Sequence, residues 1–354
     1  MKKNSKSNSG LTRRDFLKAT SISAAGLTFL GSFPINIKDQ LSQEYSRIKS
    51  RIVLVRNPNV INEEGVVDLN ILIDMLEKAI MRYSGEKSAA NFWKNNFVKD
   101  KTIGLKVNTL GLNSIANTTL TNHFTAFTDA IIESSKKAGI NQDRFIIWDR
   151  SEEELLSAGY KIQKEKGSLR VLGCVESRRG DGGIGYMEEE FSVGEKKTRL
   201  AKILTDMCDS IINIPLIKDH GTAGFTGALK NHYGSINNAR EFHSNNCTSP
   251  GIPEVNTIPI IRQKQKIIIT NALSCVFNGG PRWDRKFIWN YGGILIGTDP
   301  VAIDTIMFNI INEKRKSEGL SPISENVAKH IRLSSELGLG TNNMNEIDLL
   351  EINL

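Results

Sequence analysis

Short apolar runs alternate with amphipathic segments along residues 50–354. The runs have the length of buried strands, and the segments between them repeat apolar side chains at helical spacing. Strands are predicted at 51–57, 102–108, 144–149, 169–173, 209–215, 266–273 and 292–297, and helices at 66–83, 120–139, 152–159, 200–207, 224–233, 299–316 and 324–337. This alternation predicts an α/β fold with a mostly parallel sheet covered by helices on both faces. Ligands of such sheets bind beyond the carboxyl ends of the strands.

The densest group of polar residues lies in the segment 216–243, after the strand predicted at 209–215. Three of the five histidines of the chain fall in this segment. Its glycines let the backbone approach a ligand, and a helix beginning near Gly224 would point its amide hydrogens at an anion. The candidate residues are Lys218, Asp219, His220, Lys230, Asn231, His232 and His243.

These residue types suggest proton transfer or ligand binding. We predict His220 to be a general base, with its pKa tuned by Asp219 or Lys218. Lys230 would bind an anion or cofactor or, if desolvated, act as a nucleophilic amine. His243 and His232 are candidate metal ligands. The alternative is a polar loop whose histidines are hydrogen-bonded to the backbone.

A second strand end would supply the opposite wall of the same crevice. The stretch KVNTLG ends the strand predicted at 102–108 with Lys106 and Asn108. Together with Lys230 and Asn231, these residues are the predicted ligand-binding or cofactor-binding set. Ordinary loop chemistry is the alternative for this stretch.

The first 33 residues predict a targeting segment. A basic stretch ends in TRRDFLK at 12–18 and is followed by an apolar run at 19–33. The stretch resembles a twin-arginine signal, with Arg13 and Arg14 followed by Phe16, Leu17 and Lys18. The resemblance implies recognition by the Tat translocase and a periplasmic or other extracytoplasmic location. The apolar run is short for a permanent span, and its retention as an uncleaved anchor is the alternative. We therefore predict a signal at 1–33, a linker at 34–49 and a single α/β domain at 50–354.

The charge of the chain is concentrated in this leader. The formal net charge is +7, of which residues 1–40 carry +5 and the rest +2. The body also lacks a basic stripe interleaved with aromatic residues, so we expect no nucleic-acid partner.

The four cysteines predict no metal cluster. Cys174, Cys208, Cys247 and Cys275 lie far apart in the sequence, without the CxxC spacing of zinc or iron–sulfur sites. We expect no iron–sulfur cluster in this chain. The cysteines are expected to be small buried side chains, with one disulfide formed after export as the alternative.

Several stretches of the body resemble domain-of-unknown-function family 362, in its form with a twin-arginine leader. They are GLKVNTLG (104–111), WDRSEEELLSAGY (148–160), INIPLIKDHGTAGFTGALKNHYGSINNAREFH (212–243), PGIPEVNTIPIIRQKQKIIITNAL (250–273) and GGILIGTDPVAIDTI (292–306). The resemblance implies a fold class and a location for the site, and no reaction.

The segment from His220 to His243 is similar in order to a motif of the lactate racemase family. In that family a His precedes a Gly-rich turn and a Lys, and a second His follows. Here these are His220, the turn AGFTGALK (223–230), Lys230 and His243. The resemblance implies a nickel-pincer nucleotide tethered by Lys230, nickel bound by His243 and proton exchange at His220. The departures are Ala228 and Leu229 in place of the second glycine of the turn, and a shorter spacing to His243.

These observations predict an exported soluble enzyme that binds a small anionic ligand, or a metal-type or nucleotide-type cofactor, at the 216–243 segment. Proton transfer is the expected chemistry, as in a racemase or epimerase, with other proton-transfer or redox enzymes left open. The alternative is a non-catalytic periplasmic protein that binds or delivers a ligand or metal.

Overall fold

The computed structural model describes residues 49–177, 180 and 182–354. The predicted signal and nearly all of the predicted linker lie outside these residues. Residues 50–354 form one compact unit. Across the described residues, no helix has the length and apolar character that a membrane span needs.

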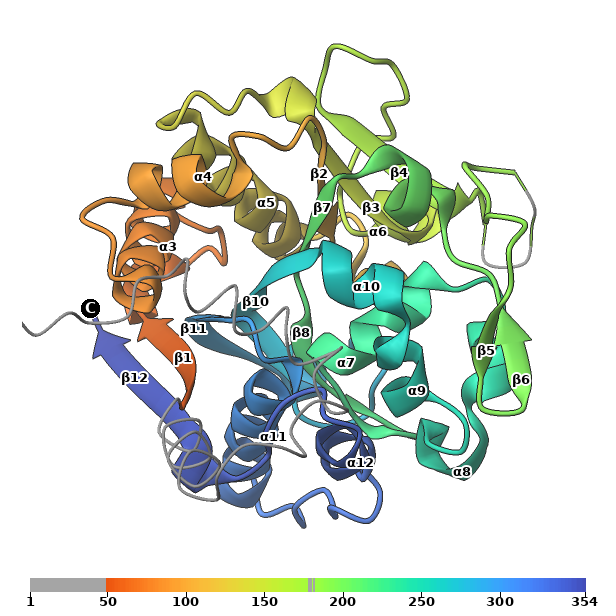
Figure 1. Cartoon of the computed structure of the whole chain (residues 1–354). Coiled ribbons are helices and arrows are strands. Elements are labelled where there is room, and N and C mark those ends of the chain that lie inside the picture. The colour runs from red at the N-terminus through yellow and green to blue at the C-terminus, as the bar shows by residue number, and fades with distance from the viewer. Residues whose placement is uncertain (1–48, 178–179, 181) are drawn as a thin grey trace, which may run out of the picture. The chain divides into compact units, whose positions relative to one another are not determined.

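A ten-stranded sheet forms the centre of this unit (Figure 1). The strands of its main path lie in the order β12, β1, β11, β10, β7, β2, β3 and β4. Strand β8 pairs with β10 and with β9, and a separate hairpin joins β5 to β6. The bounds are β1 (Ser50–Arg56), β2 (Ile103–Lys106), β3 (Phe145–Ser151), β4 (Arg170–Val175), β5 (Phe191–Val193), β6 (Lys196–Thr198), β7 (Ser210–Asn213), β8 (Leu216–His220), β9 (Gly224–Thr226), β10 (Gln265–Val276), β11 (Ile288–Gly297) and β12 (Ile347–Asn353).

The sheet is mostly parallel, as the sequence predicts. Strands β10, β7, β2, β3 and β4 run parallel to one another, and β12 is parallel to β1. Strand β11 is antiparallel to both of its neighbours, β1 and β10. The carboxyl ends of β7, β2 and β3 therefore meet at one edge, with Lys106 in register with both Asn213 and Trp148.

Helices cover both faces because alternate strand residues point in opposite directions. In β3, Phe145 and Ile147 enter one apolar core, whereas Ile146 and Trp148 enter the other. The first core is completed by α3 (Leu69–Ser84), α4 (Ala89–Phe97), α5 (Asn122–Lys136) and α6 (Glu152–Ser157). The second is completed by α7 (Ala228–Asn231), α8 (Ser244–Cys247), α9 (Ile252–Thr257), α10 (Pro259–Lys264), α11 (Pro300–Ser317) and α12 (His330–Glu336). The predicted α/β fold is confirmed.

One local difference from the sequence prediction lies at 224–233. Gly224–Thr226 is strand β9, which turns back on β8, and the helix begins only at Ala228. Gly224 has a φ of 72°, and a Cβ there would lie 2.9 Å from the Ile323 side chain. The positive φ and the close packing favour glycine at this turn.

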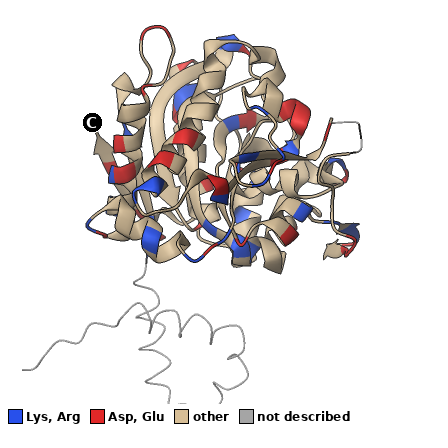
Figure 2. Ribbon diagram, turned by 90° about the horizontal axis from the view of Figure 1, so that it is seen from above, with Lys and Arg blue, Asp and Glu red and all other residues tan. Residues whose placement is uncertain are grey.

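Charged residues of both signs are interspersed along the ribbon of the described residues (Figure 2). The four cysteines are free thiols and are buried, as expected for small apolar side chains.

Candidate active site

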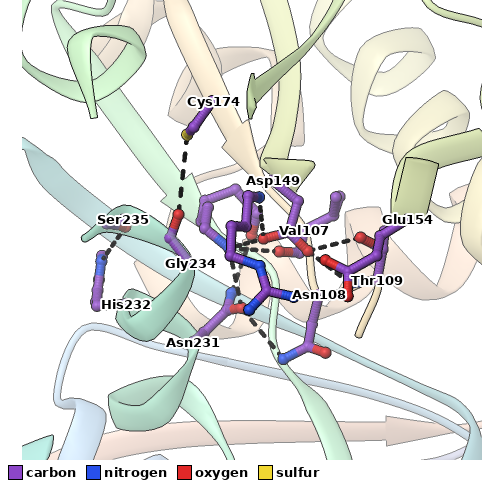
Figure 3. A network of polar contacts seen from close by, with 12 residues as sticks. Val107, Asn108, Thr109, Asp149, Glu154, Cys174, Asn231, His232, Gly234 and Ser235 are labelled. Atoms are coloured by element: carbon purple, nitrogen blue, oxygen red, sulfur yellow. Dashed lines mark hydrogen bonds and ion pairs between the residues drawn. The ribbon is translucent and has the colours of Figure 1, made fainter. Parts of the chain in front are cut away.

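A buried ion pair lies where β2 and β3 end. The Lys106 ammonium is 2.7 Å from Asp149 Oδ1 and donates to the Val107 carbonyl at 2.8 Å. Asp149 Oδ2 accepts from both the amide and the hydroxyl of Thr109, at 2.7 Å each (Figure 3). Burial alone would raise the pKa of Asp149, but the Lys106 charge and the hydrogen bonds from Lys106 and Thr109 lower it. Asp149 is therefore held as a carboxylate.

Asn231 connects this pair to α7. Its amide nitrogen donates to the Lys106 carbonyl at 3.1 Å and to Asn213 Oδ1 at 2.7 Å. Its amide oxygen accepts from Lys106 Nζ and from Asn108 Nδ2, each at 3.3 Å. The structure thus brings together Lys106, Asn108 and Asn231, as the strand-end argument predicts.

Two further lysines are buried without a carboxylate partner. Lys218 is 0% exposed, and its ammonium donates to the Leu110 carbonyl at 2.8 Å and to Asn108 Oδ1 at 3.4 Å. Lys230 is 5% exposed, and its ammonium lies 4.2 Å from the centre of the Tyr233 ring. Burial lowers the pKa of each lysine to about 8. Among the described residues neither ammonium forms an ion pair.

His220 lies on the same face of β8 as Lys218 because the two are separated by one residue. Its Nδ1 accepts from the backbone amides of Thr222 and Ala223, at 3.1 Å each. A nitrogen that accepts two hydrogen bonds carries no proton, so the neutral ring has its proton on Nε2. Burial lowers the pKa of His220 to about 2, and the charges of Lys230 and Lys218 act in the same direction. The ring is therefore a neutral hydrogen-bond donor, and the predicted role as general base does not fit this tautomer.

His243 carries its proton on the other ring nitrogen from His220. Its Nδ1 donates to the Ala239 carbonyl at 2.9 Å, which leaves the lone pair on Nε2. The ring centre of His243 lies 5.9 Å from that of His220 and 5.6 Å from that of Tyr233. Burial lowers the pKa of His243, and the Lys230 charge lowers it further. His243 is therefore the neutral imidazole of this group that can accept a proton.

The two ring nitrogens of His232 contact residues other than His220, Tyr233 and His243. Its Nδ1 contacts Ser235 Oγ at 3.2 Å and its Nε2 contacts Gln265 Oε1 at 2.9 Å. Both nitrogens of this predicted metal ligand are thus engaged by the protein. Residues 49–177, 180 and 182–354 contain no group of three or more His, Cys, Asp or Glu side chains that could hold a metal ion.

Asp219 points away from His220. It pairs with Phe225 across the hairpin, and its carboxylate accepts from the Gly280 amide at 2.6 Å. Strand alternation places it on the face opposite Lys218 and His220. Of the two residues predicted to tune His220, the structure thus supports Lys218 and not Asp219.

The start of α7 also differs from its predicted role as an anion site. The amides of Ala228 and Leu229 donate to the Asp304 carboxylate, at 2.6 and 3.1 Å. The helix start therefore faces Asp304 and not an external anion. Burial raises the pKa of Asp304 to about 8, against the effect of these two hydrogen bonds. No sequence signal links Asp304 to this helix, because the residues are more than 70 positions apart.

Tyr233 and His330 are two further residues that the sequence analysis does not assign to the site. Tyr233 contacts both Lys230 and His243 through its ring. Its position three residues after Lys230, on the same helical side, is the signal that could have identified it. His330 is 0% exposed and stacks on Phe225, and neither ring nitrogen has a hydrogen-bond partner among the described residues.

The comparisons with known proteins place the site within a family. The model of a domain of unknown function, DUF362, matches residues 103–309. The chain belongs to the DUF362 family. The matched residues of the DUF362 domain include the Lys106 pair, Lys218, His220, Lys230 and His243. His330 and α12 lie beyond the match.

Two other comparisons accompany the family match. No curated protein matches the chain. A crystal structure of a protein from Thermotoga maritima, solved by a structural genomics consortium, matches over 76% of this chain at 12% identity, with a TM-score of 0.37. The alignment covers 59% of that protein, so this chain spans about three fifths of its length.

Proposed function

We propose that this DUF362 domain is an enzyme that binds a small anion between β8 and α7 and transfers a proton at a carbon atom of it. The observation that carries the proposal is the burial of Lys218 and Lys230 without carboxylate partners, beside His220 and His243. Lys106 and Arg150 are paired with Asp149 and Glu154, whereas Lys218 and Lys230 are not paired among the described residues. Burying an unpaired charge is costly, and an anionic ligand would remove that cost.

The two imidazoles would have different tasks. The Nε2–H of His220 would donate to an oxygen of the ligand and stabilise negative charge that develops there. A neutral imidazole with a lowered pKa is suited to this, because it donates a hydrogen bond without giving up its proton. The Nε2 of His243 would accept the proton from carbon.

Calorimetric titration of the protein with oxalate tests the binding step. We expect replacement of Lys218 or Lys230 by Met to weaken oxalate binding at least about thirtyfold, because removing one partner of a buried charge pair costs about 2–5 kcal/mol. Replacement of the exposed Lys166 by Met is the control and should leave binding unchanged. Equal affinity in all four proteins would place the anion site elsewhere.

A non-catalytic binding protein is the alternative function. Binding needs only the lysines and the His220 donor, whereas catalysis also needs the free Nε2 of His243. A variant with His243 replaced by Gln should bind oxalate but lose exchange of carbon-bound hydrogen for deuterium in a bound acid. If the wild-type protein binds acids and exchanges no such hydrogen, the binding-protein alternative is supported.

A nickel-pincer nucleotide is a second candidate, and one observation favours it. His243 donates its Nδ1–H to a backbone carbonyl, which is the usual arrangement of a histidine that binds a metal through its other nitrogen. Lys230 and His243 are thus suited to holding such a group. His220 is not suited to exchanging a proton in its present tautomer, so we assign no step to that cofactor.

We also propose export through the Tat translocase, which rests on Arg13 and Arg14 and their neighbours. Replacement of both arginines by Lys should retain the protein in the cytoplasm, as measured by cell fractionation. A double variant with Lys2 and Lys3 replaced by Arg keeps the leader charge and should be exported normally. Unchanged export of the Arg13→Lys, Arg14→Lys protein would contradict the proposal.

A further inference from the structure

We infer that Lys230 forms a Schiff base with a small oxo acid, so that the ligand class of the proposed site is a carboxylate that also carries a ketone or aldehyde carbonyl. This inference rests on the proposed anion site and goes beyond it, since it assigns a covalent step to one named nitrogen. A Schiff base acidifies the neighbouring C–H bond, which matches the proposed proton transfer at carbon.

The contacts of the three buried lysines single out Lys230. Lys106 is bound by the Asp149 carboxylate and by a backbone carbonyl. Lys218 donates to the Leu110 carbonyl and to the Asn108 side chain. Lys230 has no oxygen acceptor among the described residues and contacts only the face of the Tyr233 ring. An amine that is hydrogen-bonded to fixed acceptors has to break those bonds before it can react. The Lys230 amine has no such bonds to break.

The surroundings of Lys230 contain no counter-charge for its side chain. The side chain is nine-tenths buried or more, and no carboxylate pairs with it in the described part of the chain. A desolvated lysine without a carboxylate partner is one way in which a protein obtains a nucleophilic amine.

The other groups of the site would accommodate an oxo acid. The Lys218 ammonium supplies a positive charge for the carboxylate. Lys230 contacts the Tyr233 ring, Tyr233 contacts His243, and His243 contacts His220, so the amine and the two imidazoles belong to one group of contacts. The Nε2–H of His220 can donate to an oxygen of the acid, and His243 Nε2 can accept the proton of the carbon next to the imine.

The covalent step is a condensation. The nitrogen lone pair of Lys230 attacks the carbonyl carbon, a C–N bond forms and the carbonyl C–O bond is lost. The oxygen leaves as water with the two amine hydrogens, and the imine takes up one proton from solvent to become an iminium. No oxidant or reductant is needed.

Reductive trapping with pyruvate tests the inference on the full chain. Incubation with pyruvate and sodium cyanoborohydride should give one stable adduct per chain, which peptide mass mapping should locate on Lys230. Lys230→Arg keeps the positive charge but cannot form the imine, and this variant should lose the adduct. Lys166→Arg is the control for reaction of surface lysines and should be trapped on Lys230 as the wild-type protein is.

Two results would overturn the inference. One is wild-type protein that binds pyruvate in calorimetry and forms no adduct. The other is an adduct spread over exposed lysines or retained by Lys230→Arg. Both leave the anion site in place and remove only the covalent step, whereas absence of any oxalate or pyruvate binding removes the proposed function itself. Because the mapping is done on the wild-type protein, the test stands even if a variant fails to fold.

Discussion

At the scale of single residues, the three lysines that are buried in the described part of the chain have different partners. Lys106 is paired with Asp149, whereas neither Lys218 nor Lys230 has a carboxylate partner among these residues. The first arrangement stabilises the junction of β2 and β3. In the proposed function, an anionic ligand would offset the desolvation energy of the second arrangement. The same side-chain type would then serve structure at one position and binding at two others.

The Lys106–Asp149 pair should be essential for stability. Replacing Asp149 by Asn leaves a buried ammonium without its counter-charge, and we expect a loss of about 3–5 kcal/mol in the free energy of unfolding. Denaturant titration measures this loss. The exposed pair of Lys137 and Glu77 is the control, and Lys137→Met should cost less than about 1 kcal/mol. Equal losses for the two variants would contradict the structural role of the buried pair.

The two unpaired lysines predict opposite pH dependences for stability and for binding. Folding lowers their pKa from 10.5 to about 8, so between these values the unfolded chain holds protons that the folded protein has released. The free energy of unfolding of the ligand-free protein should therefore rise from pH 8 to pH 10. Oxalate favours the ammonium form, so its affinity should fall over the same range, by up to about tenfold per pH unit for each lysine.

Calorimetry and denaturant titration at several pH values measure both trends. In the Lys230→Met protein, the rise of the free energy of unfolding with pH and the fall of oxalate affinity with pH should each be about half as steep as in the wild type. Oxalate affinity that is constant from pH 7 to pH 10 would show that neither lysine contacts the anion.

At the scale of elements, the short helix α7 is held in place by a residue from α11. Asp304 accepts hydrogen bonds from the first two amides of α7, and this helix carries Lys230 and Asn231. A Cβ on Gly227 would lie 2.2 Å from Asp304 Oδ1, which shows how closely the two helices approach. Asp304 is a positioning residue in this account.

Replacement of Asp304 by Ala should therefore weaken oxalate binding as well as stability. We expect a stability loss of about 1–2 kcal/mol, typical of a lost helix cap, and a drop in oxalate affinity because Lys230 is no longer fixed. Asp68 is the matched control, because it caps α3 through the amides of Asn70 and Ile71, and α3 carries neither a site residue nor Asp304. Asp68→Ala should lose similar stability and keep its affinity for oxalate. If both variants bind oxalate as the wild type does, Asp304 does not position the site.

The sequence predicts elements with a regular pattern and misses those without one. The apolar runs at 102–108 and 144–149 predict β2 and β3, and their ends correctly place Lys106 near Asn108 and Asn231. The hairpin of β8 and β9 is missed because its strands are short and polar. Its geometry decides which side of the hairpin Asp219 faces, and it fixes the tautomer of His220 through two backbone amides. No residue pattern encodes such contacts.

At the scale of the whole molecule, the site combines segments that are far apart in the sequence. The carboxyl ends of β2, β3 and β8 meet α7 at one edge of the sheet, as expected for a parallel α/β fold. Helix α12 adds the buried His330 from beyond the family match, and its ring nitrogens have no hydrogen-bond partner among the described residues. Because these contacts join segments that are distant in the sequence, composition and spacing alone do not predict the role of each residue.

A crystal structure of the protein soaked with selenate would show whether Lys218 and Lys230 bind an anion. Selenate is a small dianion that does not titrate near neutral pH, and its selenium can be located by anomalous scattering. We predict a peak in the site, with selenate oxygens about 2.8 Å from the ammonium nitrogens of Lys218 and Lys230. Selenate bound only to surface residues, with these two nitrogens in their present contacts, would contradict the account.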